Sequence, residues 1–193
     1  MLDFKDDVKM QQIFIPGGLF PFTKAQVFDY EYGVFQLLNV YGKITEDQRK
    51  QCVSMWLQTG VIPTVELAWQ RSEQVCYMFI HRPTGQLAGV NTLYSEVDAA
   101  TGEKWFLNRM FIRPKFRSTR LMIIGTSLML VFAKTYLAKE GDKGVKNINE
   151  NKKLHKKSLR KIFTRLGYTF SHAFNEKEVW FFDFDAVEFV SSQ

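Results

Sequence analysis

The run from Leu107 to Leu137 constrains the fold of this chain more than any other segment. It reads LNRMFIRPKFRSTRLMIIGTSLMLVFAKTYL, which is an apolar strand, a proline, a short cationic turn and a long apolar helix. A helix start offers unpaired backbone N–H groups and the positive end of the macrodipole, so it attracts anions. The turn adds Arg117 and Arg120 at that point. The pattern therefore predicts a phosphate or pyrophosphate cradle, and hence a nucleotide-like cofactor.

Length and composition favour one domain over residues 1–193. The chain has 193 residues, of which 46% are hydrophobic and 15% aromatic, enough to bury a substantial core. Cys52 and Cys76 lie in apolar segments without CxxC spacing or a nearby pair of histidines. We expect them to be buried free thiols of a cytoplasmic protein rather than a disulfide or zinc ligands. We expect no signal peptide at the charged N-terminus, and no bound metal.

Residues 121–137 are the one segment apolar enough to suggest a membrane span. The stretch is short and contains Gly125, Thr126, Ser127 and Lys134. A spanning helix needs about 20 mostly apolar residues. We therefore interpret the segment as a buried core helix and expect no membrane association.

The positive charge is concentrated in one segment. The chain carries a net charge of +6, and seven cations without an acid lie between Lys152 and Arg165. The rest of the chain is close to neutral. A local patch of this kind indicates a local anionic partner, such as a cofactor phosphate, a nucleic acid or an acidic protein. A solvated helix face is the alternative.

Residues 1–74 are predicted to be largely helical, with a helix within residues 24–40. Thr45 followed by Gln48 forms a capping box, and Gly60 is a stop signal, so a helix is expected from Glu46 to Thr59. A second helix is expected from Thr64 to about Ser72. Phe14 and Ile15 could form an edge strand.

From residue 75 onwards, strands dominate the predicted structure. Strands are expected at 75–80, 87–94, 104–112, 145–148 and 179–184, with 168–174 as a partner of the last strand. Helices are expected at 120–137 and 154–166, the second amphipathic and closed by Gly167. This order predicts an α+β fold, with a central mixed, mostly antiparallel sheet flanked by helices.

With this order in place, the chain resembles the GCN5-related N-acetyltransferase (GNAT) superfamily over residues 75–184. The family places Arg/Gln-x-x-Gly-x-Gly/Ala after a strand and at the start of a helix. Here the matching run puts Arg117 on the leading position, with Arg120 and Met122 where the family has small residues. A second element, Asn147-Ile148-Asn149-Glu150-Asn151 followed by a helix ending in Gly167, resembles the other recurring segment. The family's acid tyrosine falls on Phe163, which has no hydroxyl.

The resemblance implies a GNAT-like single domain that uses acetyl-CoA or another acyl-CoA. Residues 1–74 would form the acceptor side, and residues 75–193 the sheet core with the cofactor elements. Met110 to Ile112 would line the pantetheine slot, and their main-chain N–H groups would hold the thioester oxygen. The cofactor-binding residues implied are Met110, Phe111, Ile112, Arg117, Ser118, Thr119, Arg120, Leu121, Met122, Asn149, Asn151, Lys153 and Lys156.

Candidates for catalysis are fewer. Asn108 and Arg109 lie on the strand before the turn, where the superfamily often has a polar catalytic or water-holding group. Glu150 follows a short strand and could accept a proton from an amine. Tyr94 and Tyr168 are expected to be core or pocket wall rather than acids.

The resemblance favours an N-acyltransferase that moves an acyl group from coenzyme A to an amine of a small molecule or protein, by direct attack. The protein would act as a monomer or homodimer. Two other functions stay open. One is a GNAT-fold binding protein that has lost catalysis. The other is a nucleic-acid-directed modification enzyme of the phage Mom type, which the patch from Lys152 to Arg165 would suit.

Overall fold

The fold is built on one mixed β-sheet. The computed structural model describes residues 22–99, 101–117, 119–149 and 157–186. Eight strands form one sheet in the order β1-β2-β3-β4-β5-β6-β8-β7, and the pair β5–β6 is parallel while the other pairs are antiparallel. The strands are β1 (Asp29–Tyr32), β2 (Phe35–Asn39), β3 (Val75–His81), β4 (Gln86–Val97), β5 (Lys104–Ile112), β6 (Asp142–Asn149), β7 (Thr169–Phe174) and β8 (Lys177–Asp183). The predicted α+β fold with a mixed, mostly antiparallel sheet is confirmed.

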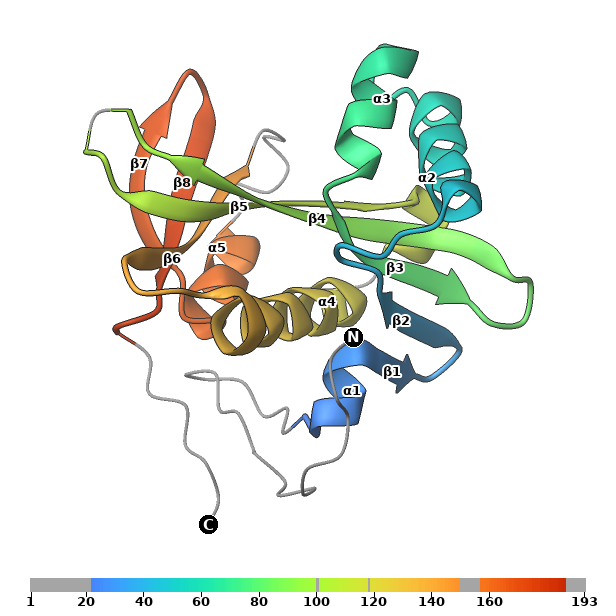
Figure 1. Ribbon diagram of the computed structural model, residues 1–193, viewed down its shortest axis with the longest axis horizontal. Coiled ribbons are helices and arrows are strands. Elements are labelled where there is room, and N and C mark those ends of the chain that lie inside the picture. The colour runs from blue at the N-terminus through green and yellow to red at the C-terminus, as the bar shows by residue number, and fades with distance from the viewer. Residues whose placement is uncertain (1–21, 100, 118, 150–156, 187–193) are drawn as a thin grey trace.

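Helices cover both faces of the sheet (Figure 1). They are α1 (Lys24–Phe28), α2 (Glu46–Gln58), α3 (Val65–Ser72), the 3-10 turn η1 (Pro114–Phe116), α4 (Thr119–Phe132), the π-helical turn η2 (Ala133–Leu137) and α5 (Lys157–Arg165). Side chains of α2 and α3 pack on one face, around Met78 and Val90. Side chains of α4 and α5 pack on the opposite face, around Phe79 and Phe182.

The N-terminal part of the chain differs from the sequence prediction. A helix was expected within residues 24–40, but only Lys24–Phe28 is helical, and Asp29–Tyr32 and Phe35–Asn39 form a hairpin that extends the sheet. Gly33, with φ of +56°, allows the tight turn between the two strands. Burial alternates along the hairpin, as a strand requires and a helix does not. The aromatic side chains of this stretch pack from strands of the sheet rather than from a helix. The possible strand at Phe14 and Ile15 lies outside the described residues.

The predicted helix signals in the next segment are confirmed. The Gln48 N–H donates to Thr45 Oγ1 at 3.3 Å, and the Thr45 N–H donates to Gln48 Oε1 at 2.9 Å, which is the reciprocal capping box. Gly60 follows α2 with φ of +64°. Thr64 caps α3 through its side chain alone, accepting from the Leu67 N–H at 3.2 Å. Both helices therefore begin where the sequence indicates.

Helix α4 is the central helix of the second face. The span Arg120–Leu137 is long and apolar enough to cross a membrane by length and composition, but 61% of it is buried inside the molecule. It therefore packs as a core helix. Its last turn, Ala133–Leu137, is π-helical rather than α-helical.

Strand β6 begins earlier than expected. The sequence predicted a strand only from Val145, but β6 starts at Asp142. Gly144 explains the difference: its φ is +155°, and a Cβ there would lie 1.9 Å from the Phe182 carbonyl oxygen of β8. The missing side chain lets the two backbones approach closely. For the helix expected at 154–166, α5 covers Lys157–Arg165, and residues 154–156 lie outside the described residues. Both cysteines are buried and free, as predicted.

Candidate active site

The parallel strands β5 and β6 separate in the middle of the sheet. They pair from Lys104 opposite Asp142 to Asn108 opposite Asn147. Strand β5 then continues to Ile112, paired there with β4 alone. The last residues of β5 therefore have one edge without a strand partner, next to the end of β6.

Main-chain groups of Met110 and Ile112 face this opening. The Arg113 N–H donates to the Ala88 carbonyl of the β4 side at 2.8 Å. The main-chain N–H and C=O groups of successive residues point in opposite directions along an antiparallel strand. Those of Phe111 therefore also point toward β4, and those of Met110 and Ile112 point away from it. The Ile112 carbonyl accepts a hydrogen bond from Arg117 Nε at 3.1 Å. The N–H groups of Met110 and Ile112 are thus presented toward the opening.

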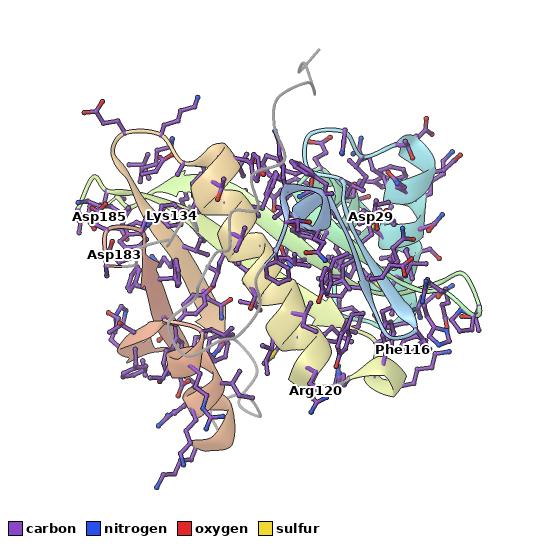
Figure 2. All side chains as sticks on the ribbon, turned by 90° about the horizontal axis from the view of Figure 1, so that it is seen from below. Asp29, Phe116, Arg120, Lys134, Asp183 and Asp185 are labelled. Atoms are coloured by element: carbon purple, nitrogen blue, oxygen red, sulfur yellow. The ribbon has the colours of Figure 1, made fainter. Side chains whose placement is uncertain are left out.

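Helix α4 begins beside the end of β5. Figure 2 shows Arg120 at the start of the helix, at the end opposite Lys134. Arg117 and Arg120 are exposed, and the first turn of α4 contains no acidic residue. Leu121 is fully buried and Met122 half-buried, so their side chains face the protein. The start of α4 combines helix N–H groups with positive charge, as the sequence indicates.

The side chain of Met110 packs β5 against α4. A Cβ added at Gly125 would lie 2.5 Å from Phe79 Cζ and 3.3 Å from Met110 Cε. Met110 therefore faces α4, and Phe111 faces the cluster formed by α2 and α3. Glycine at position 125 sets how closely α4 approaches the strand that borders the opening.

Asn108 belongs to a buried amide network that spans three strands. Its Oδ1 accepts from Asn91 Nδ2 at 2.5 Å, and its Nδ2 donates to Asn147 Oδ1 at 3.4 Å. Asn147 Nδ2 in turn donates to Asn149 Oδ1 at 2.8 Å. All four side chains are buried, and the network lies on the α4 face, where β5 and β6 separate. Asn91 was missed from the sequence, although an asparagine inside the apolar β4 was a visible signal.

Phe163 of α5 and Tyr168, which follows that helix, lie next to this network. The Phe163 ring stacks on Trp180 with centroids 5.3 Å apart, and Tyr168 packs between Phe163 and Phe182. Burial raises the pKa of the Tyr168 hydroxyl well above its ordinary value, and the neighbouring Asn108 amide opposes that shift. Tyr168 is a core residue, as expected.

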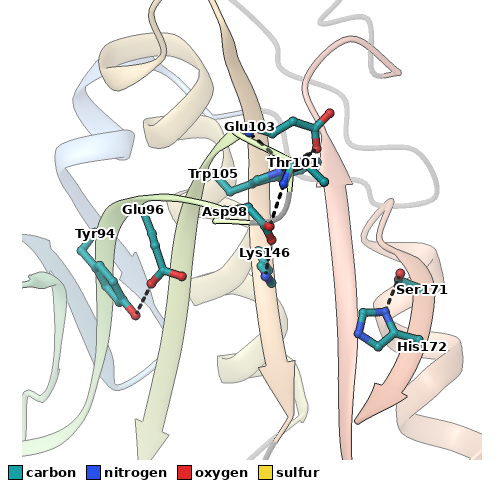
Figure 3. A network of polar contacts seen from close by, with 9 residues as sticks. All are labelled: Tyr94, Glu96, Asp98, Thr101, Glu103, Trp105, Lys146, Ser171 and His172. Atoms are coloured by element: carbon teal, nitrogen blue, oxygen red, sulfur yellow. Dashed lines mark hydrogen bonds and ion pairs between the residues drawn. The ribbon is translucent and has the colours of Figure 1, made fainter.

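Arg109 lies on the opposite face of the sheet from Met110. Its guanidinium carbon is 4.8 Å from the Tyr94 ring centroid, and its Nη2 donates to the Tyr94 hydroxyl at 2.7 Å. This face also carries polar contacts within β4 and between β6 and the residue after β4 (Figure 3). Tyr94 pairs with Glu96 at 3.4 Å and Lys146 with Asp98 at 3.3 Å. Tyr94 is therefore part of a polar surface.

The charged patch is only partly described. Arg160 of α5 donates through Nε to the buried Glu178 carboxylate at 2.7 Å, with a second contact from Nη2. That cation is therefore neutralised by the protein. Lys157, Lys161 and Arg165 are exposed. Ser118, Glu150, Asn151, Lys153 and Lys156 lie outside the described residues, so their predicted roles stay predictions. Asn149 is buried in the amide network.

A mixed sheet in which two parallel strands separate beside a cationic helix start is the architecture of the GNAT acetyltransferases. Comparison with known structures agrees. A protein described as a GNAT-family acetyltransferase from Bordetella pertussis superimposes with a TM-score of 0.57 and 13% identity, covering 79% of this chain and 97% of that one. An acetyltransferase of the GNAT family from Bacillus anthracis gives 0.55 and 6%, covering 82% and 99%.

NAA60 from Arabidopsis thaliana, solved in complex with acetyl-CoA, gives a TM-score of 0.51 and 9% identity, covering 76% of this chain and 96% of that one. No protein-family model and no curated protein matches the sequence. The chain therefore has the GNAT fold, as the resemblance implied. At these sequence identities, the likeness to the known structures establishes the fold alone.

Proposed function

We propose that the protein is an acyl-CoA-dependent N-acyltransferase, using acetyl-CoA or another acyl-CoA. The observation that carries the proposal is the opening between β5 and β6, with the N–H groups of Met110 and Ile112 directed into it. An extended pantetheine arm carries amide groups that can pair with such an unpartnered strand edge. The start of α4, with Arg117 and Arg120 exposed, would receive the pyrophosphate.

In the proposed reaction, the lone pair of the acceptor amine attacks the thioester carbonyl carbon directly. A C–N bond forms, the C–S bond breaks, and the thiolate of coenzyme A leaves and takes up a proton. The amine nitrogen loses its proton to a base or to water. Negative charge develops on the carbonyl oxygen during attack, and the Met110 or Ile112 N–H would stabilise it. Because Phe163 has no hydroxyl, the donor to the thiolate would be another group or water.

The first experiment is calorimetric titration of the purified protein with acetyl-CoA, beside a thermal-shift scan. Specific binding raises the melting temperature by mass action. In the double variant Arg117→Ala/Arg120→Ala, we expect affinity to fall by about tenfold or more, since each charge-assisted contact contributes about 1.5–3 kcal/mol.

Lys115→Ala is the matched control, because Lys115 lies in the same turn, is exposed and precedes the helix start. It should bind normally. Unchanged affinity in the double variant would refute the pyrophosphate placement. Absence of any binding at millimolar acetyl-CoA would refute the function itself. Binding without turnover of any amine would favour a GNAT-fold binding protein that has lost catalysis.

The nucleic-acid alternative predicts a steep salt dependence of DNA binding. The pairing of Arg160 with Glu178 removes one cation of the patch from that role. Cytoplasmic location, and a monomeric or homodimeric state, stay proposals that rest on the same function.

A further inference from the structure

A half-buried arginine lies on the sheet face opposite the proposed cofactor elements. On the α4 face, Met110 contacts the helix whose start would hold the pyrophosphate. Side chains alternate along a strand, so Arg109 projects to the other face. An amine that attacks a bound thioester directly must approach from the side that the cofactor leaves open. If the proposed function holds, Arg109 is therefore on the acceptor side, one residue from the N–H of Met110.

The guanidinium of Arg109 is fixed in place by Tyr94. It lies over the ring at 4.8 Å from the centroid and donates to the hydroxyl at 2.7 Å. A guanidinium carries five N–H donors. Its contact with Tyr94 engages a single donor group, Nη2, and stacking restricts the side chain's motion. The arrangement holds the remaining donors ready for a ligand with paired oxygens.

A lysine on the neighbouring strand is paired with a carboxylate. Lys146 of β6, which lies opposite Leu107 of β5, pairs with Asp98 at 3.3 Å. Within the described part of the chain, no carboxylate lies within ion-pair distance of Arg109. A half-buried guanidinium is partly desolvated, and an anion is the ligand that compensates it best.

We propose that the acceptor is an amine that also carries an anionic group, a carboxylate or a phosphate, which Arg109 binds. Binding that group holds the amine at a fixed distance from the opening between β5 and β6, which converts attack into an oriented step. Arg109 would thus determine substrate specificity. The proposal rests on the acyltransferase function but goes beyond it, because it specifies the charge of the acceptor.

The test uses matched acceptor pairs with acetyl-CoA as donor and coenzyme A release as the measurement. Each amino acid is compared with its carboxamide, and phosphoethanolamine with ethanolamine, so that the carboxylate and phosphate arms are separate. We expect at least one anionic member to exceed its neutral partner about tenfold or more in kcat/KM, the effect of one charge-assisted contact. In Arg109→Gln, that ratio should fall toward one, and Arg109→Lys should keep part of it.

Arg82→Gln is the control for net charge, because Arg82 is an exposed arginine paired with Glu31 at the far side of the sheet. It should leave the ratio unchanged. Equal rates within every pair would overturn the inference, and so would a ratio that survives Arg109→Gln. Acetyl-CoA binding without turnover of any anionic amine would also count against it. Absence of acetyl-CoA binding would instead refute the proposed function, and calorimetry detects that case separately.

Discussion

The amide network at the point where β5 and β6 separate makes a quantitative prediction about stability. In Asn91→Ala, the buried Oδ1 of Asn108 loses its donor. In Asn108→Ala, Asn91 Nδ2 and Asn147 Oδ1 both lose their partner. Each buried polar group left without a partner costs about 1–3 kcal/mol. The single variants should therefore lose about 1–3 and about 2–6 kcal/mol of unfolding free energy.

The double variant of Asn91 and Asn108 should lose less than the sum of the two. Removing both side chains leaves only Asn147 Oδ1 without its partner, at about 1–3 kcal/mol. The interaction energy of the cycle is then about 2 kcal/mol or more, well above the additivity error of roughly 0.5 kcal/mol for independent sites.

Urea unfolding of the four proteins at 25 °C, monitored by fluorescence with a common m-value, measures the cycle. Additive losses would refute the reasoning, because they would mean that the two amides do not satisfy each other. If Asn108→Ala is too unstable to measure, the Asn147→Ala and Asn149→Ala pair tests the same network through its 2.8 Å contact.

Two further predictions concern the backbone and the thiols. Gly144→Ala should lower the unfolding free energy by at least about 2 kcal/mol more than Gly141→Ala, because only the first meets a backbone oxygen at 1.9 Å, although both glycines have positive φ. Equal losses in urea unfolding would contradict the proposed contact. Burial raises the pKa of Cys52 to about 12 and that of Cys76 well above 9.0, so both thiols should resist a disulfide reagent at pH 8 until denaturant is added. The thiols of the unfolded chain ionise at lower pH than those of the folded protein. The contribution of the buried thiols to folding stability should therefore be intact below pH 9 and decline as pH rises toward 12. Rapid labelling of the native protein would show that these thiols are not buried.

Much of the fold could be predicted because its signals are local. The capping box at Thr45 and Gln48, the stop at Gly60 and the proline before α4 act within a few residues of where they lie. Short apolar runs bounded by turn signals, such as the turn from Arg82 to Gly85, predicted the strands from β3 onwards. The first hairpin was missed because Asp29 to Asn39 is rich in large aromatic and apolar residues, which suit a buried helix or a sheet edge equally well.

The site was predicted less completely, because its parts meet only through long-range pairing. The cationic turn and the Met110–Ile112 strand lie in one continuous run, so the sequence alone linked them. Asn91 meets Asn108 only through the register of β4 on β5. The stacking of Arg109 on Tyr94 likewise depends on that register, and no spacing rule along the chain predicts it.

The separation of β5 and β6 has a consequence for how such a protein can diverge. The donors at Met110 and Ile112 belong to the peptide backbone, which every residue except proline supplies. A strand edge of this kind survives almost any change of side chain, so the sequence around it can change while the geometry persists. Identities of 6–13% to structures of the same fold are what that freedom allows. In such a fold, the geometry of the strand separation can persist after the sequence around it has diverged.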